Sequence, residues 1–280
     1  MTGDRILTRA VAHGGLSIGA ILVIALVAAA TLSLAWTPYP PGAIDVPHKL
    51  LAPSSLHWLG TDGLGRDVVA QLLAGARVSI LVGVIAVGIG LIAGVALGLI
   101  AASSNGLVDP IIMRLSDFTF AFPALLMAIM LTSAYGPGIV NAIIAIGIFN
   151  IPVFATLARA VGKSVLARDY ILAARVAGKG PARIALEHVL PNIAPALIVQ
   201  ATIQFAIAIL AEAALSYLGL GAQPPQASWG RMLSDAQALM FQAPRLVVFP
   251  GIAIALSVLG LNLLGDGLRD ILDPRLRGRG

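Results

Sequence analysis

The basic side chains best placed to bind a partner are gathered in one segment, residues 159–195. The segment reads RAVGKSVLARDYILAARVAGKGPARIALEHVLPNIAP and lies between two strongly apolar runs. Its six Lys and Arg residues are Arg159, Lys163, Arg168, Arg175, Lys179 and Arg183. In a membrane protein, such a polar and basic segment lies outside the bilayer, and its charge favours the cytoplasmic side. The chemistry we expect of it is contact with a soluble partner.

A second set of polar side chains lies inside an apolar run. Gln200 and Gln204 are one helical turn apart and share a face, and Glu212 is the one acidic residue well inside that run. Ionisable groups within a membrane are usually functional or paired, because exposing them to lipid costs about 3 kcal/mol or more. We expect these three residues either to line a solute path or to brace neighbouring helices. For Glu212, bracing of the adjacent external loop is a further alternative.

The sequence carries no recognisable catalytic or metal constellation. Its four histidines, His13, His48, His57 and His188, are dispersed, and it has no cysteine. It also lacks a glycine-rich phosphate loop ending in Lys-Ser or Lys-Thr. We therefore expect no metal site, no cofactor in this chain and no enzymatic activity of its own.

The composition defines the class of protein that presents these residues. Hydrophobic residues make up 58% of the chain and charged residues only 11%, against about 25% charged in soluble proteins, and the mean hydropathy is +0.94. The basic residues lie at the ends of apolar runs, not interleaved with aromatics on one face, which argues against a nucleic-acid partner. The sequence predicts an all-α membrane protein with one membrane domain.

Six apolar runs predict six transmembrane helices, an even number that places both termini on one side. They fall at about residues 16–36, 78–101, 119–135, 139–157, 196–220 and 246–265. With both termini in the cytoplasm, 13 Lys and Arg residues lie inside and five outside, the bias that the positive-inside rule requires. The first run is long for a signal peptide and lacks a convincing cleavage site, so we interpret it as a retained helix.

Glycine spacing predicts how two of these helices meet their neighbours. Gly90, Gly94 and Gly98 recur every four residues, which leaves one helix face free of side chains for close packing. Gly136 and Gly138 flank Pro137 between the third and fourth runs, a composition typical of a tight hairpin.

The basic segment itself predicts a helix, a glycine turn and a second helix. The first helix covers about residues 165–177 and presents Tyr170, Leu172 and Val176 on an apolar side. The stretch from Gly178 breaks it, and the second helix begins at Pro181 and is stopped by Pro191. The alternative is an ordinary solvated loop.

The external residues 221–245 predict a short amphipathic helix. The apolar residues recur close to helical spacing between Pro225 and Pro244, and they are Trp229, Met232, Leu233, Ala236, Leu239 and Met240. We expect this helix to lie at the outer membrane interface, where it would either help to receive an external protein or act as a simple anchor.

Taken together, these residues resemble the inner-membrane permease subunits of bacterial ATP-binding cassette importers. The signature of that family is Glu-Ala-Ala, three residues, Gly, nine residues and Ile-x-Leu-Pro. Ala173, Ala174, Gly178, Leu190 and Pro191 fall in register with it, whereas Leu172 and His188 replace the usual Glu and Ile. Asp169, about one turn earlier, could partly substitute for the missing acidic residue.

Three further segments resemble the second permease type of the peptide and nickel branch of that family. They are HWLGTDGLGRDVVAQLLAGARVSI (57–80), ILAEAALSYLGLGAQPPQASWGRMLSDA (209–236) and NLLGDGLRDILDPRLRG (262–278). The resemblance implies a type I importer permease fold with three parts. These are residues 1–76 (cytoplasmic segment, first helix and external loop), the transport domain 77–268 and a cytoplasmic tail 269–280.

The resemblance also implies the partners and the contact residues. The chain would pair with a homologous second permease, two cytoplasmic ATPases that bind ATP and Mg, and an external solute-binding protein, all at the bacterial inner membrane. The loop 158–195 would couple to the ATPases through Asp169, Ala173, Ala174, Arg175, Gly178, Lys179, Gly180 and Pro191.

The expected cargo is a di- or oligopeptide. Nickel or another small solute stays open, because YPPGAIDVPHKLLAP, before residue 54, also resembles nickel-branch permeases. A more distant alternative is a channel or ion-coupled carrier that works without ATPases.

Overall fold

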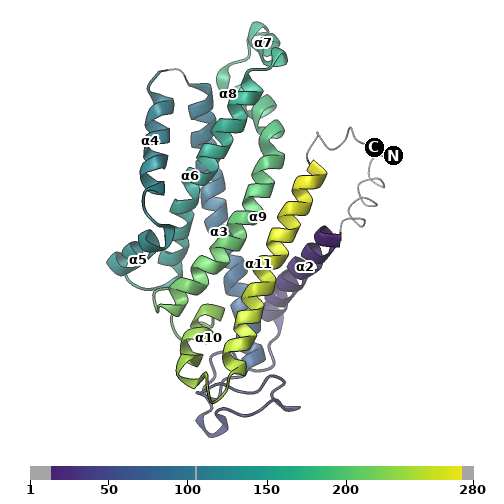
Figure 1. Ribbon diagram of the computed structural model, residues 1–280, viewed down its shortest axis with the longest axis vertical. Helices are drawn as coiled ribbons and strands as arrows, with labels where there is room; N and C mark the ends of the chain where they lie inside the picture. The colour runs from purple at the N-terminus through teal and green to yellow at the C-terminus, as the bar shows by residue number, and fades with distance from the viewer. Residues whose placement is uncertain (1–13, 105, 273–280) are drawn as a thin grey trace.

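The structure is a computed structural model that describes residues 14–104 and 106–272. Its long helices stand side by side along one axis, with α7 at one end and α10 at the other (Figure 1). The helices along the chain are α2 (Gly14–Ala35), η1 (Val46–His48), α3 (Val68–Ser103), α4 (Val108–Phe120), α5 (Ala124–Tyr135), α6 (Ile139–Leu166), α7 (Asp169–Val176), α8 (Pro181–Ile184), the π-helical η2 (Ala185–Val189), α9 (Leu190–Tyr217), α10 (Trp229–Ala236), η3 (Gln237–Leu239) and α11 (Arg245–Leu272).

Five of the described helices are long and apolar enough to cross a membrane, and a bent pair makes a sixth candidate span. The five are α2, α3, α6, α11 and the continuous helix from Pro181 to Tyr217. The sixth span is where the prediction of a single helix over 119–135 is wrong. Helix α4 starts earlier, at Val108, and α5 bends away from it by 84°.

The bend between α4 and α5 has a local cause. Pro123 has no backbone N–H to continue the helix, and a residue before proline is disfavoured in the α conformation. The chain therefore leaves the helix after Phe120 and starts α5 at Ala124. Helix α5 is 12 residues long, about 18 Å, and so is too short to cross a bilayer alone.

The glycine stripe of α3 is in contact with α6, as its spacing predicts. Each glycine faces the backbone or a small side chain of α6: Gly90 meets Asn150, Gly94 meets Ile151 and Phe154, and Gly98 meets Ala155 and Ala158. The Asn150 amide also donates a hydrogen bond of 3.4 Å to the carbonyl of Ala86. Helices α3 and α6 thus approach backbone to backbone and form the centre of the molecule.

The first described residues of α2 and the last of α11 both point toward the α7 end of the molecule (Figure 1). The segment 36–67 and α10 lie at the opposite end. This fits an even number of crossings, and the assignment of the α7 end to the cytoplasm stays a prediction. Most of the predicted tail 269–280 and the residues before Gly14 lie outside the described residues.

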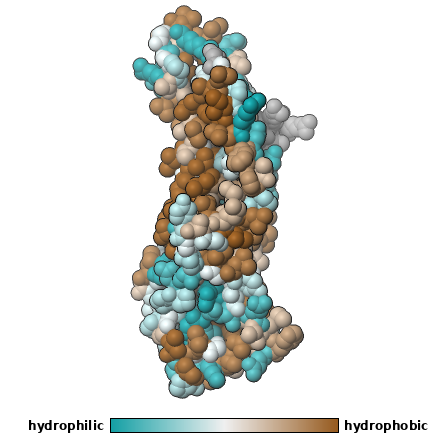
Figure 2. Space-filling view, turned by 90° about the vertical axis from the view of Figure 1, so that its left-hand side faces the viewer, coloured by the Kyte–Doolittle hydropathy of each residue, from teal (hydrophilic) through white to brown (hydrophobic). Residues whose placement is uncertain are grey.

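The face that carries α4 and α5 shows how the molecule suits a membrane. In Figure 2 apolar side chains cover the middle of this face, and polar side chains gather toward its two ends. Exposed apolar residues on α4 include Ile111, Leu115 and Phe118. Such a band suits contact with lipid, because lipid tails are as apolar as these side chains.

The predicted external helix exists as α10, but its apolar face does not lie on the membrane. Trp229, Met232 and Ala236 are buried against the protein. The Trp229 indole donates a 3.0 Å hydrogen bond to the carbonyl of Leu72, and its ring lies against Gly75 of α3. Packing on α3 and α9 therefore takes the apolar surface that the sequence assigned to the membrane interface.

The α3–α6 contact predicts a sharp difference between two glycines of one helix. A Cβ added at Gly94 would lie 2.7 Å from the Cβ of Phe154 and closer still to the carbonyl oxygen of Ile151. At Gly88 an added Cβ meets nothing within 4 Å. We expect Gly94→Ala to lower the free energy of unfolding in detergent by about 1–3 kcal/mol.

The matched variant Gly88→Ala should leave this free energy unchanged or raise it by about 0.5–1 kcal/mol, because alanine favours helix. Denaturation titrations of both variants in the same detergent measure the difference. Equal stabilities would show that α3 and α6 do not meet at Gly94.

Candidate functional site

Residues 167–184 form a compact helical hairpin at the α7 end, which we call the α7–α8 hairpin. The sequence predicted its first helix over 165–177, but α6 continues to Leu166 and α7 starts only at Asp169. Helix α8 begins at Pro181, as predicted. Between α6 and α7, the backbone of Arg168 is extended, and the chain changes direction there.

Gly178 ends α7 with a Schellman motif. Its φ is +80°, its N–H donates to the carbonyl of Arg175 at 2.9 Å, and the N–H of Lys179 donates to Ala174 at 3.1 Å. These are the two hydrogen bonds of that motif, and the left-handed backbone they need favours glycine. Gly180, by contrast, has an ordinary φ of −71°.

One side of the hairpin is anchored in the protein and the other is free. Ile171, Ala174 and Ile184 are buried in the same apolar cluster as Val165 of α6. The sequence expected Ala174 to face a partner, and its burial corrects that expectation. Ala173 remains exposed.

The exposed side of α7 carries two large apolar side chains. Leu172 is 63% exposed and Val176 is 82% exposed. Arg175 and Asp169 lie exposed beside them, and Asp169 is in the first turn, where a carboxylate stabilises the helix dipole. The exposed face of α7 therefore combines apolar and charged groups, the mixture found at protein interfaces.

Ion pairs hold the segment that leads from α7 through α8 into η2. The Lys179 ammonium lies 2.7 Å from one carboxylate oxygen of Glu187, and Arg183 lies 2.5 Å from the other. The same ammonium is 3.0 Å from Nε2 of His188. Lys179 thus connects the end of α7 to the start of the next long helix, which the sequence did not indicate.

Pro191 does not stop the second helix, contrary to the prediction. The chain passes from α8 through the π-helical η2 into α9 without a break, and the N–H of Leu190 donates to the carbonyl of Ala185. This wider turn accommodates a proline ring and its missing N–H, as is common for π-bulges in helices. The hairpin is consequently continuous with the membrane helix α9.

A second ionic cluster at the same end was missed from sequence. The Asp109 carboxylate of α4 pairs with Arg159 and, at 2.5 Å, with Lys163, both on α6. These two cations belong to the basic segment, but their partner lies 50 and 54 residues away along the chain. Only the antiparallel packing of α4 on α6 brings them together.

The structure separates the three polar residues expected on a path. Gln200 lines a cavity of about 520 Å³ between α6, α9 and α11, together with Arg168, Asn192 and Arg269. Gln204 is buried and does not line that cavity. Their role in transport stays a prediction, but they no longer form one surface.

Glu212 is fully buried near the α10 end of α9. Ser216 donates a 2.6 Å hydrogen bond to its carboxylate and accepts one of 2.9 Å from the N–H of Ala222. Close by, Gly230 of α10 packs directly on the backbone of Ala213. In this arrangement Glu212 holds the turn after α9 against α10, which favours the bracing alternative over contact with a solute.

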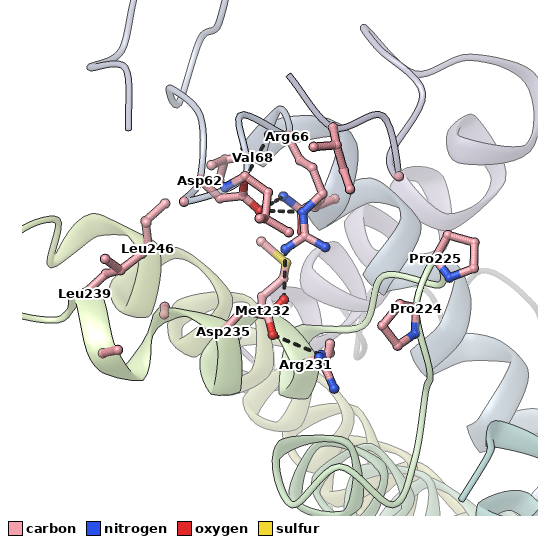
Figure 3. A pocket seen from close by; sticks show the side chains of 17 residues that line it. Asp62, Arg66, Val68, Pro224, Pro225, Arg231, Met232, Asp235, Leu239 and Leu246 are labelled. Atoms are coloured by element: carbon pink, nitrogen blue, oxygen red, sulfur yellow. Dashed lines mark hydrogen bonds and ion pairs between the residues drawn. The ribbon is translucent and has the colours of Figure 1, made fainter. Parts of the chain in front are cut away.

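At the α10 end, charged residues line a cavity of about 480 Å³, which we call the α10 cavity (Figure 3). Arg66 lies between Asp62, at 2.6 Å, and Asp235 of α10, at 2.8 Å. Burial disfavours the charged guanidinium, but its hydrogen bonds and proximity to Asp235 and Asp62 outweigh burial and raise the pKa of Arg66.

Hydrogen bonds at and near the α10 cavity hold the segment 36–67 against the helices. Asp62 also accepts a 2.9 Å hydrogen bond from Gln71 of α3, and Arg245 of α11 donates to the carbonyls of Leu50 and Leu51 at 3.1 and 2.9 Å. Apolar side chains such as Met232 and Leu239 complete its walls. The result is a depression on the predicted external face in which the acidic and basic side chains neutralise one another.

Within the described residues, no group of three or more His, Cys, Asp or Glu side chains could hold a metal ion.

Comparisons with known proteins agree on one kind of relative. Residues 94–278 match the family described as binding-protein-dependent transport system inner membrane component. The chain is 45% identical over 273 residues to the di/tripeptide transport system permease protein DppC of Pseudomonas aeruginosa, covering 95% of this chain and 90% of that one. It is 43% identical over 260 residues to the dipeptide permease protein DppC of Alkalihalophilus pseudofirmus, with 93% and 86% covered.

Two other comparisons extend this result. The chain is 44% identical over 260 residues to the glutathione transport system permease protein GsiD of Escherichia coli, with 92% and 86% covered. Among solved structures, the inward-facing MetNI methionine ABC transporter aligns with a TM-score of 0.58 at 17% identity, covering 74% of this chain and 96% of that one. The last comparison shows a shared fold.

The Schellman motif predicts that Gly178 and Gly180 respond differently to the same substitution. Gly178→Ala forces an L-residue into the left-handed region, at a cost of about 1–2 kcal/mol. We expect amide hydrogen exchange in residues 169–179 to accelerate by roughly 5- to 30-fold. Gly180→Ala, with nothing within 4 Å of the added Cβ at either glycine, should not change it.

Hydrogen exchange followed by mass spectrometry measures both variants under the same conditions. Equal exchange in Gly178→Ala and Gly180→Ala would mean that the left-handed turn does not stabilise the hairpin.

Proposed function

Because the chain belongs to the family of binding-protein-dependent transport system inner membrane components, a family of the bacterial inner membrane, we propose that it forms half of the membrane path of an ATP-driven peptide importer. The observation that carries the proposal is identity of 43–45% over most of the chain to permease subunits named for dipeptides and di/tripeptides. Glutathione, named for another relative, is itself a tripeptide. Small peptides are therefore the proposed cargo.

The other half of the path is a second, homologous permease subunit in this proposal. The chain presents apolar helix faces that are exposed when it is alone, including Ile198 and Ile207 on α9. A partner helix bundle or lipid has to cover such faces.

The ATPases dock on the α7–α8 hairpin. Support comes from the exposed apolar side of α7, from the signature residues Ala173 and Gly178 within it, and from its rigid attachment to α9. ATP and Mg bind to those partner subunits, which hydrolyse ATP, and this chain transmits the resulting movement. A rigid-body shift of the hairpin would tilt α9 directly, because no flexible loop separates them.

The external solute-binding protein docks at the α10 end. The α10 cavity supports this assignment, because it offers a shaped depression whose charged residues are already paired and whose wall is held in place by the ion pairs of Arg66 with Asp62 and Asp235. A surface of that kind can receive a partner's side chain without rearranging.

Uptake by the complete complex tests the proposal. The permease pair, the ATPases and the binding protein are reconstituted in proteoliposomes and given labelled dialanine, trialanine or nickel. We expect peptide uptake that requires both ATP and the binding protein. Uptake of nickel alone, or peptide uptake without ATP, would contradict the proposed function.

The docking role of the hairpin predicts that one exposed side chain controls ATPase attachment. Val176→Asp places a charge at a position 82% exposed in the isolated chain, so folding should be unaffected. Burying that charge at an interface weakens binding, and we expect ATPase affinity and ATP-dependent uptake to fall by about 10-fold or more. Copurification and uptake are the measurements.

Leu107→Asp is the matched control. Leu107 is also an apolar residue at the α7 end, 76% exposed, but it lies between α3 and α4, outside the hairpin. This variant should keep its ATPases. Loss of ATPases in both variants, or in neither, would place the docking surface elsewhere.

A further inference from the structure

Helix α9 separates two cavities of opposite chemistry. On one side, a groove of about 760 Å³ between α3 and α9, the α3–α9 groove, is lined by apolar residues and a single threonine, Thr202. On the other side lies the cavity of about 520 Å³ introduced above, the α9–α11 cavity, which contains Arg168, Asn192, Gln200 and Arg269. The two faces of one helix therefore meet different surroundings.

The α9–α11 cavity is positively charged. Arg168 and Arg269 both line it, and no acidic residue does. Their sequence neighbours Asp169, Asp266 and Asp270 are exposed and lie outside the lining. Within residues 14–104 and 106–272, neither arginine forms an ion pair. Among the described residues, two exposed guanidinium groups thus line one cavity without an acidic partner.

The polar lining continues into the membrane part of α9. Asn192 and Gln200 lie on one side of the helix eight residues apart, which corresponds to about 12 Å along its axis. Apolar residues such as Val199 and Ile203 fill the intervening and deeper wall. Polar groups at this depth suit water or a solute better than a lipid tail, because a lipid tail cannot hydrogen-bond to them.

We propose that the α9–α11 cavity is a binding site for the terminal carboxylate of a peptide at the predicted cytoplasmic end of its path, with Arg168 and Arg269 as the cations that receive it. Guanidinium groups bind carboxylates through two parallel hydrogen bonds, and both arginines line the cavity with exposed side chains. The inference rests on the proposed function, since it takes the solute to be a small peptide.

The carboxylate is the group that a tolerant peptide path can recognise. Dipeptides and tripeptides differ in length and side chains, but each ends in a free carboxylate. A volume of about 520 Å³ lies within the range of about 300–1,000 Å³ typical of small-molecule sites. Asn192 and Gln200 add donors and acceptors that suit peptide amides of any sequence.

The test uses a thiol as a local probe, since the chain contains no cysteine of its own. Gln200→Cys in the complete complex, in nanodiscs, is treated with an anionic and a cationic methanethiosulfonate reagent, and labelling of this chain is followed by mass spectrometry. Relative to their rates with a free thiol, we expect the anionic reagent to react about 10-fold faster, because clefts of one charge concentrate the opposite charge. Arg168→Gln with Arg269→Gln should abolish that preference.

Dialanine and its C-terminal amide then test the ligand. Dialanine should slow labelling of Gln200→Cys, and the amide, which lacks the carboxylate, should not. Val199→Cys, in the same cavity, should show the same charge preference and the same protection by dialanine as Gln200→Cys. Because Gln200 is intact in this variant, it controls for the loss of a contact made by the Gln200 side chain. Ile198→Cys, on the α3–α9 groove, should show neither charge preference nor protection.

Matched arginine variants complete the design. Arg114→Gln removes one charge from an exposed site on α4 and should leave the charge preference intact. Arg269→Lys keeps the charge in the cavity and should therefore retain the preference for the anionic reagent. Loss of the preference in this variant too would mean that the double variant loses it through misfolding and not through loss of charge.

The outcomes distinguish this inference from the proposed function. If the complex imports peptides but dialanine gives no protection, the inference is wrong and the function stands. Protection that depends on anionic lipid instead of dialanine would identify a lipid headgroup site and would also overturn it. A complex that imports no peptide contradicts the proposed function, whatever the charge preference at position 200.

Discussion

The close contact of α3 with α6 is the constraint on which the rest of the structure depends. Membrane helices gain little from burying apolar surface, so their association relies on close packing. Gly90, Gly94 and Gly98 allow the two backbones to meet along several turns. Because α6 extends to Leu166, this contact also supports the base of the α7–α8 hairpin, and α4 is tied to the same helix through Asp109.

The same arrangement explains how a force at one end can reach the other. The hairpin is anchored through Ile171 and Ile184 in the central apolar cluster and continues through η2 into α9. At the far end of α9, the hydrogen bonds among Glu212, Ser216 and Ala222 hold the turn toward α10. If an ATPase docks on the hairpin as proposed, its movement would shift the wall of the α9–α11 cavity and the α10 end together.

Local sequence signals predicted the elements well where one residue type decides the geometry. The glycine stripe, the turn at Gly178 and the start of α8 at Pro181 are of this kind. The predictions were wrong where proline acts differently in two places: Pro123 breaks a span that looked continuous, and Pro191 is absorbed by a π-helical turn.

The tertiary pairs could not be predicted from local sequence. Asp109 with Arg159, and Arg66 with Asp235, join residues 50 and 169 positions apart, so only the packing of helices reveals them. The burial of Ala174 and of the apolar face of α10 depends equally on neighbours that one helix does not disclose. The separation of Gln200 from Gln204 has the same origin.

If the α7–α8 hairpin and the α3–α6 core move as one body, the distance between a spin label on each of them stays fixed. Labels at Arg175→Cys on the hairpin and Arg77→Cys on α3 span the contact, and both side chains are exposed. In the complete complex, the distance between these labels should stay the same with and without a nonhydrolysable ATP analogue. The distance from the hairpin to the second permease subunit should change. A change in the distance between the two labels within this chain would mean that the hairpin moves without the α3–α6 core.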